Sequence, residues 1–136
     1  MNTNKKIPQV SVKLIFRCNK NVLYQITNGK IRDIPGGTVK FGETLMEALR
    51  RELKEELNYI LEKDPRLLYV WTYLSSDGLT HRVLIIYILD IQKQIKFVHQ
   101  EDQGQTRFIW ISKEKIKAEK FLPEMEKALL CAIDFT

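Results

Sequence analysis

The first third of the chain alternates hydrophobic and polar positions, the pattern typical of β-strands. Val10–Cys18 carries an aliphatic or aromatic residue at every second position, and Val22–Thr27 is a second extended segment. Asn28-Gly29 is a hairpin signal, because both residues tolerate the positive φ angles of a tight turn. We therefore expect two strands and a hairpin that leads into a short extended piece, Ile31–Ile34.

The spacing of the hydrophobic residues then changes from two to four, which indicates a helix. Thr44 is suited to the N-cap, and Glu47, three residues later, completes a capping box. Asn58 is suited to the end, because asparagine tolerates the left-handed conformation of a helix C-terminus. The pattern predicts a helix over about 45–57 with an inner stripe of leucines: Leu45, Leu49, Leu53 and Leu57.

The second half of the chain returns to extended patterns before a final helix. Arg66–Ser75 and His81–Gln92 predict a pair of strands, and Phe108–Ile111 predicts a last one. Pro123 is suited to the first turn of a helix that continues to about Ile133, with Met125, Leu129, Leu130 and Ile133 inside. Strands interrupted by a helix and followed by another helix predict an α/β fold with a mixed β-sheet between helices. We expect one domain over residues 1–136.

Composition excludes several classes of protein. No apolar stretch is long enough to span a bilayer, and the first ten residues lack the apolar core of a signal peptide, so we expect a cytoplasmic protein with no membrane partner. The net charge of +5 suits an anionic ligand, but the lysines are scattered and predict no nucleic-acid groove. Cys18 and Cys131 have no metal-ligand spacing and predict no disulfide. The sequence leaves a homodimer open.

Three glutamates on the first helix are candidates for chemistry. Glu52, Glu55 and Glu56 are spaced by three and four residues, which places them on one helix face where like charges repel. Two readings are open. The glutamates form the solvated face of an ordinary amphipathic helix, or they bind a hard divalent cation through oxygen ligands. The second is favoured because Glu52 and Glu56 border the apolar stripe, where an unpaired charge is costly.

The same region resembles the signature of the Nudix hydrolases, including the family's MutT-like members. That signature is Gly, five residues, Glu, seven residues, then Arg-Glu-apolar-any-Glu-Glu-any-Gly-apolar. Ile34-Pro35-Gly36-Gly37 resembles the family's lead-in, whereas Asn58 replaces the usual Gly and Tyr59 a usual aliphatic residue. The match covers fewer than one fifth of the residues, but its spacing is long and specific. The matching positions are Gly37, Glu43, Arg51, Glu52, Leu53, Glu55 and Glu56.

The resemblance implies a Nudix-type α/β/α sandwich and hydrolysis of a diphosphate linkage in a nucleoside diphosphate derivative. It implies Mg²⁺, with Mn²⁺ as an alternative, because a divalent cation neutralises the phosphates and activates water. The implied metal ligands are three carboxylates and one backbone carbonyl, those of Glu52, Glu55, Glu56 and Gly36.

The resemblance also implies catalytic roles for four side chains. Arg51, paired with Glu43, would orient the carboxylates. Glu52 is the expected general base. Glu101, on a later polar loop, is an alternative base or a distal metal ligand, and the competing reading makes it part of a solvated turn. Gly37, Arg32, Trp71 and Tyr73 are candidate substrate contacts, although core packing explains the two aromatic residues equally well.

The expected function is therefore that of a Mg²⁺-dependent pyrophosphohydrolase acting on a nucleoside di- or triphosphate derivative. Nucleotide sugars, ADP-ribose and dinucleotide polyphosphates are alternative small-molecule substrates. A nucleotide-binding sensor without turnover is the alternative outside enzymes; the complete set of carboxylates favours catalysis.

Overall fold

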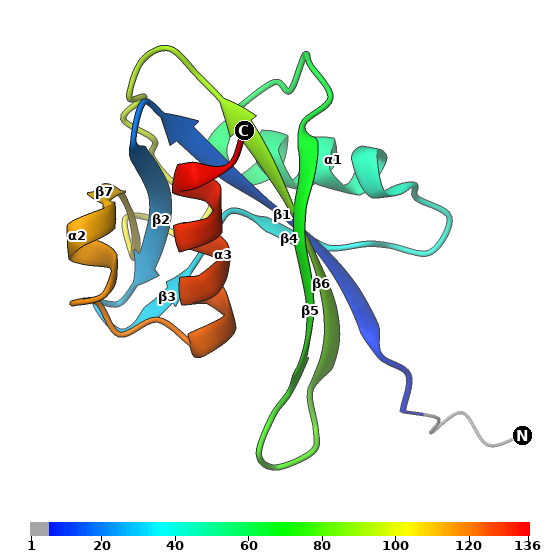
Figure 1. Cartoon of the computed structure of the whole chain (residues 1–136). Helices are drawn as coiled ribbons and strands as arrows, with labels where there is room; N and C mark the ends of the chain where they lie inside the picture. The colour runs from blue at the N-terminus through cyan, green and yellow to red at the C-terminus, as the bar shows by residue number, and fades with distance from the viewer. Residues whose placement is uncertain (1–5) are drawn as a thin grey trace, which may run out of the picture.

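The computed structural model describes residues 6–136, in which one sheet of seven strands lies between helices (Figure 1). The strands are β1 Gln9–Cys18, β2 Asn21–Thr27, β3 Ile31–Asp33, β4 Gly36–Thr38, β5 Arg66–Leu74, β6 His81–Asp90 and β7 Thr106–Ser112. The helices are α1 Leu45–Leu57, α2 Lys113–Ile116 and α3 Pro123–Asp134.

β1 is the central strand, and its two edges are used differently. One edge pairs in parallel with β6 along its length, from Gln9 opposite Arg82 to Arg17 opposite Asp90. The other edge pairs with two strands. The C-terminal end of β1 pairs with β2, and the first half of β1 pairs with β4. β2 then carries β3 on one side and β7 on the other. The sheet therefore divides beside β1, and β4 occupies the gap.

The two faces of the sheet are covered by different helices. α1 packs against Val12, Leu14 and Phe16 of β1, whereas α3 packs on the opposite face, which includes Ile15 and Ile86. Figure 1 shows α1 and α3 on opposite sides of the strands. The predicted α/β/α sandwich with a mixed sheet is confirmed.

The helix that carries the glutamates begins and ends where the sequence predicted. The Thr44 hydroxyl accepts the backbone N–H of Glu47, and the Glu47 carboxylate accepts the N–H of Thr44, so the capping box is complete. Asn58 has φ 52° and ψ 35°, the left-handed conformation expected of a C-terminal cap. The caps set the length of the helix, and the leucine stripe sets which face is buried.

Three details differ from the sequence prediction. β4 and α2 were not predicted, because three or four residues are too short to show a period. On α3, Leu130 lies only half-buried, and Ala128 and Ala132 are fully buried in its place. Small side chains allow a helix to approach a sheet closely. The buried face of α3 therefore consists of these two alanines together with the predicted Met125, Leu129 and Ile133.

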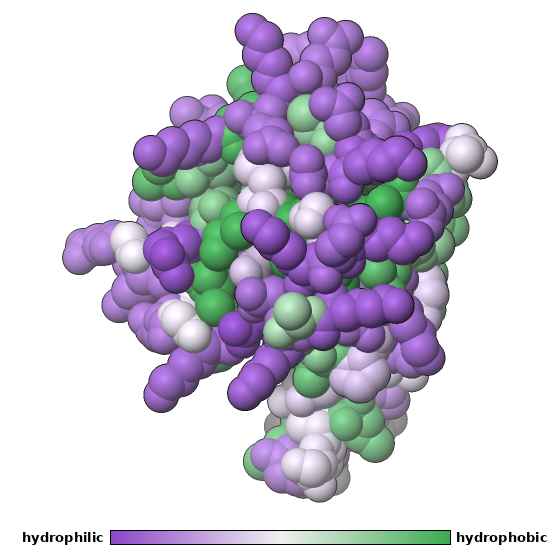
Figure 2. All heavy atoms as spheres, turned by 60° about the vertical axis from the view of Figure 1, so that its left-hand side comes forward, coloured by the Kyte–Doolittle hydropathy of each residue, from purple (hydrophilic) through white to green (hydrophobic). Residues whose placement is uncertain are grey.

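Over residues 6–136, none of the helices has the length and apolar character needed to cross a bilayer. Figure 2 shows hydrophilic side chains over most of the face that contains α2 and β7.

Candidate active site

Two glycines place the loop before α1 against the central strand. Gly36 pairs with Lys13 of β1 and has φ +143°, a conformation that side chains rarely adopt. A Cβ on Gly36 would lie 2.0 Å from the carbonyl oxygen of Val12. A Cβ on Gly37 would lie 2.3 Å from the carboxyl carbon of Glu52. Glycine is therefore required at both positions. Gly36 allows the close approach to β1, and Gly37 leaves room for the carboxylate of Glu52.

Arg51 is the centre of an ion-pair network that joins the loop before α1 to Glu52 on the helix. Its Nε and Nη2 donate to the two carboxylate oxygens of Glu43, at 2.7 and 2.9 Å. Nη1 donates to Glu52 at 2.8 Å, and Nη2 also donates to the carbonyl oxygen of Thr38 at 3.0 Å. The hydrogen bond from Arg51 is the main cause that lowers the pKa of Glu43 to about 2. The expected Arg51–Glu43 pair is present, and it positions Glu52.

Glu52 and Glu56 lie together, one turn apart on the half-buried edge of α1. The Glu52 side chain is only 15% exposed. Burial, followed by the hydrogen bond to Glu52, raises the pKa of Glu56 to about 8, and the ammonium group of Lys13 opposes this rise. Two carboxylates that share a half-buried position repel unless a proton or a cation joins them.

Glu55 lies apart from this pair. Its side chain is 45% exposed, and its nearest charged partner is Arg51, at 3.5 Å. Within residues 6–136, no three acidic, histidine or cysteine side chains converge as a preformed metal site. The Glu52–Glu56 pair nevertheless fits a hard cation, because Mg²⁺ takes one or two carboxylates and completes its shell with water and phosphate.

The loop that carries Glu101 lies against the end of α1. The backbone N–H of Gln100 donates to the carbonyl oxygen of Glu56 at 2.8 Å. Glu101 itself is exposed, and its backbone N–H is bonded to Nδ1 of His99. The tertiary structure thus brings Glu101 to the same end of the helix as Glu56, with its carboxylate at the surface.

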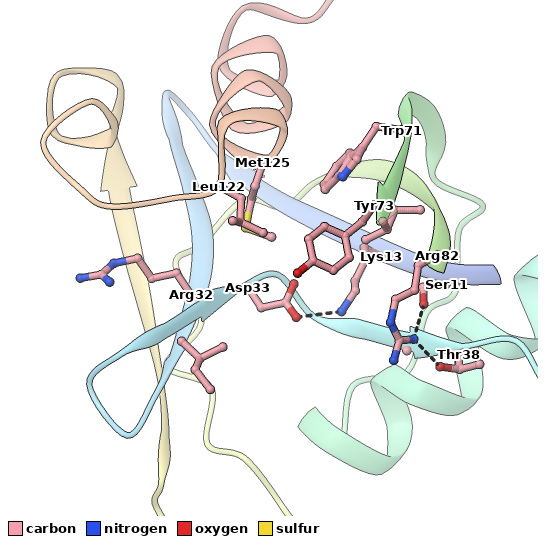
Figure 3. A pocket seen from close by; sticks show the side chains of 13 residues that line it. Ser11, Lys13, Arg32, Asp33, Thr38, Trp71, Tyr73, Arg82, Leu122 and Met125 are labelled. Atoms are coloured by element: carbon pink, nitrogen blue, oxygen red, sulfur yellow. Dashed lines mark hydrogen bonds and ion pairs between the residues drawn. The ribbon is translucent and has the colours of Figure 1, made fainter. Parts of the chain in front are cut away.

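A cleft of about 410 Å³ opens beside the glycines, on the α3 side of the sheet (Figure 3). Its walls come from β1, β3, β4, β5, β6 and the start of α3. The four candidate substrate contacts, Gly37, Arg32, Trp71 and Tyr73, all line it.

The four candidates differ in how much they offer a ligand. Figure 3 shows Tyr73 directed toward the ion pair of Lys13 and Asp33. Trp71 is 9% exposed and belongs mainly to the core. The guanidinium of Arg32 points away from the middle of the cleft and pairs with Glu119 at 2.8 Å.

Several polar residues of the cleft were not candidates from the sequence. Ser11 and Lys13 lie on β1, and Asp33 pairs with Lys13 at 3.1 Å. The available signal was their position, because polar residues inside an otherwise buried central strand need polar partners.

The comparison with protein families agrees with this geometry. The family model of the NUDIX domain matches residues 6–130, which is nearly the whole chain. The chain belongs to the NUDIX hydrolase family.

Two solved NUDIX structures share this fold. A MutT NUDIX hydrolase from Burkholderia pseudomallei superposes with a TM-score of 0.77 at 20% identity, covering 93% of this chain and 98% of the other. The NUDIX domain of Shewanella oneidensis NrtR, solved in complex with ADP ribose, has a TM-score of 0.73 at 15% identity, covering 94% and 88%. At these identities the likeness is one of fold.

A curated relative is closer in sequence. An ADP-ribose pyrophosphatase of Methanocaldococcus jannaschii is 36% identical over 88 residues, which are 62% of this chain and 52% of the relative. This chain thus spans about half the length of that protein.

Arg51, the arginine of the NUDIX signature, gives a first prediction. Arg51→Ala removes the donor that bridges Glu43 and Glu52, so we expect Mg²⁺ affinity to fall by about 10- to 100-fold. Arg51→Lys should recover only part of it, because an ammonium group does not reproduce the bidentate contact. Mg²⁺ titration followed by calorimetry measures both, and an unchanged affinity in Arg51→Ala would contradict the positioning role.

Proposed function

We propose that this NUDIX chain is a pyrophosphohydrolase that requires Mg²⁺, or Mn²⁺ in its place, and cleaves a P–O–P linkage in a nucleoside di- or triphosphate derivative. The observation that carries the proposal is the half-buried Glu52–Glu56 pair, in which Glu52 is hydrogen-bonded by Arg51 and packs against Gly37, a residue that lines the cleft. An ordinary helix surface has no reason to bury two adjacent carboxylates.

The metal site would consist of Glu52, Glu56 and the Gly36 carbonyl, and Glu55 would join it by rotating its exposed side chain. A divalent cation bound there would neutralise the phosphate oxygens and lower the pKa of a bound water.

Glu52 is the general base in this proposal. Arg51 and the close contact with Gly37 fix its carboxylate, so one oxygen is oriented to accept a proton. As water attacks phosphorus, its proton passes to Glu52, the new P–O bond forms, and the bridging P–O bond breaks. The products are two molecules that each carry one of the former linkage phosphates. Glu101 stays an alternative base, because its loop lies at the same helix end.

The substrate class is a small nucleotide, and ADP-ribose is a specific second candidate. The name of the curated relative favours ADP-ribose, while the cleft has room for a nucleoside and further phosphates. A cytoplasmic location, a homodimer and a single domain over 1–136 stay predictions.

A hydrolysis screen tests the proposal. The purified chain is incubated with nucleoside triphosphates, nucleotide sugars, dinucleotide polyphosphates and ADP-ribose, with Mg²⁺, with Mn²⁺, and with EDTA. We expect phosphate-bearing products only with a divalent cation. Binding without turnover across the whole screen would favour a nucleotide sensor, and turnover in EDTA would refute the metal requirement.

A further inference from the structure

Most charges around the cleft are already paired. Lys13 and Asp33 form an ion pair at 3.1 Å, and Arg32 pairs with Glu119 at 2.8 Å. Arg82 is different, because no carboxylate within residues 6–136 pairs with it. The cleft therefore carries a positive charge, that of Arg82, which no carboxylate of the described residues neutralises.

Two hydroxyl groups hold this charge in place. Nη1 of Arg82 donates to Ser11 Oγ and to Thr38 Oγ1, both at 3.2 Å (Figure 3). The three residues come from β6, β1 and β4, so the guanidinium is fixed by three neighbouring strands. Hydroxyls orient a guanidinium without neutralising it, which leaves its other N–H groups ready for an anion.

Thr38 joins this guanidinium to the catalytic network. Its hydroxyl accepts from Arg82, and its carbonyl oxygen accepts from Arg51. The preceding residue, Gly37, is the one against which Glu52 packs. Thr38 follows Gly37 directly in the chain, so Arg82 and Glu52 contact neighbouring residues of β4.

The other side of the cleft is apolar. Leu122 at the N-cap of α3, Met125 of α3 and Ile31 of β3 line it. Figure 3 shows Leu122 and Met125 away from Arg82. A ligand that fits both sides has an apolar face at one end and an anionic group at the other.

We propose that Arg82, oriented by Ser11 and Thr38, binds a phosphoryl group next to the hydrolysed linkage and thereby selects nucleoside triphosphates over derivatives that end in a neutral sugar. The inference rests on the proposed function and assigns its specificity to a residue outside the NUDIX signature. A charge-assisted bond of guanidinium to phosphate is among the stronger polar contacts, so its loss is measurable.

The test uses substrate pairs that share one nucleoside diphosphate. ATP is compared with ADP-ribose, and GTP with GDP-mannose, for the wild type, Arg82→Met and Arg82→Lys. We expect Arg82→Met to raise KM for the triphosphates by about tenfold or more, which corresponds to about 1.4 kcal/mol. The same variant should leave kcat for the triphosphates, and both parameters for the sugar derivatives, within about threefold. Arg82→Lys should restore part of the triphosphate affinity, because it keeps the charge but does not reproduce the hydrogen bonds of the guanidinium.

Two further variants guard the interpretation. Arg107→Met removes an exposed arginine of β7 and should change neither pair. Thr38→Val removes one orienting hydroxyl and should give a smaller KM rise for the triphosphates alone, which tests the site even if Arg82→Met melts early. An equal KM rise for both members of a pair, or none in either, would overturn the proposal.

The proposal and the function fail separately. If the wild type hydrolyses no compound of the wider screen, the function is refuted, and titration calorimetry with Ca²⁺ in place of Mg²⁺ still compares the binding of ATP and ADP-ribose. If Arg82→Met then binds ATP more weakly than the wild type does but binds ADP-ribose equally well, the anion site is supported. If the wild type and Arg82→Met bind ATP equally well, the anion site is refuted.

Discussion

We expect Glu56→Gln to lower kcat by about three orders of magnitude and to leave the fold intact. The substitution keeps the shape of the side chain but replaces an anionic oxygen of the proposed metal site with a neutral amide. Losing metal-based stabilisation costs several kcal/mol in the transition state, and about 4 kcal/mol corresponds to about a thousandfold in rate. Steady-state hydrolysis at saturating Mg²⁺ measures the effect.

Glu56→Gln should keep or raise the stability of the fold when no divalent cation is present, although it lowers the rate. Burial and Glu52 raise the pKa of Glu56 from 4.5 to about 8, so the folded state holds a proton that the unfolded chain releases. The contribution of this bound proton to folding stability is therefore fully present below about pH 4.5 and is lost as the pH rises through about 8. Glu56→Gln cannot titrate, so at pH 8 in EDTA it should melt at or above the wild-type temperature.

A matched control separates this effect from a general loss of charge. Glu62 is exposed in the segment after α1, and Glu62→Gln should leave both kcat and the melting curve unchanged. Wild-type turnover in Glu56→Gln would rule out the metal assignment. A large drop in its melting temperature would instead make Glu56 a structural residue.

The glycine pair should separate fold from catalysis in a single comparison. Gly37→Ala places a methyl group where the Glu52 carboxylate lies, and that side chain is flexible enough to move. We expect a near-normal melting temperature and a rate at least about 100-fold lower, since a misplaced catalytic group of this kind costs about that much.

Gly36→Ala should behave in the opposite way. Its methyl group would meet the carbonyl oxygen of Val12 in the central strand, at a φ that favours glycine. Overpacking and backbone strain each cost about 1–3 kcal/mol, so the melting temperature should fall by many degrees. Thermal denaturation followed by circular dichroism, with activity assayed on the folded fraction, distinguishes the two variants. Equal stability of both would contradict the close approach of β4 to β1.

Much of the framework was predictable from local patterns. The bounds of α1 follow from its leucine period, the Thr44 capping box and Asn58, all of which act within a few residues. The hairpin at Asn28-Gly29 was predictable for the same reason, and both residues have positive φ, at 54° and 67°. β4 was not predictable, because Gly36 and Gly37 form a strand only by pairing with β1, which is far away in the sequence.

The site divides in the same way. The sequence identified Glu52, Glu55 and Glu56 as candidates and placed Glu52 and Glu56 at the border of the apolar stripe, but it assigned all three as metal ligands. The structure separates Glu55, which faces solvent, from the half-buried pair. Arg82, Ser11 and Lys13 lie far from the signature in sequence, and the cleft residues come from six segments of the chain.

The sequence by itself determined the helix, its caps, the order of its charged residues and the family, because these depend on contacts within a few positions. Only the tertiary structure decided which carboxylates are buried together, which glycine meets which atom, and which arginine of the cleft has no anionic partner. Those properties depend on distances between residues that are far apart in the chain, and the pairing of β1 with β4 and β6 sets these distances.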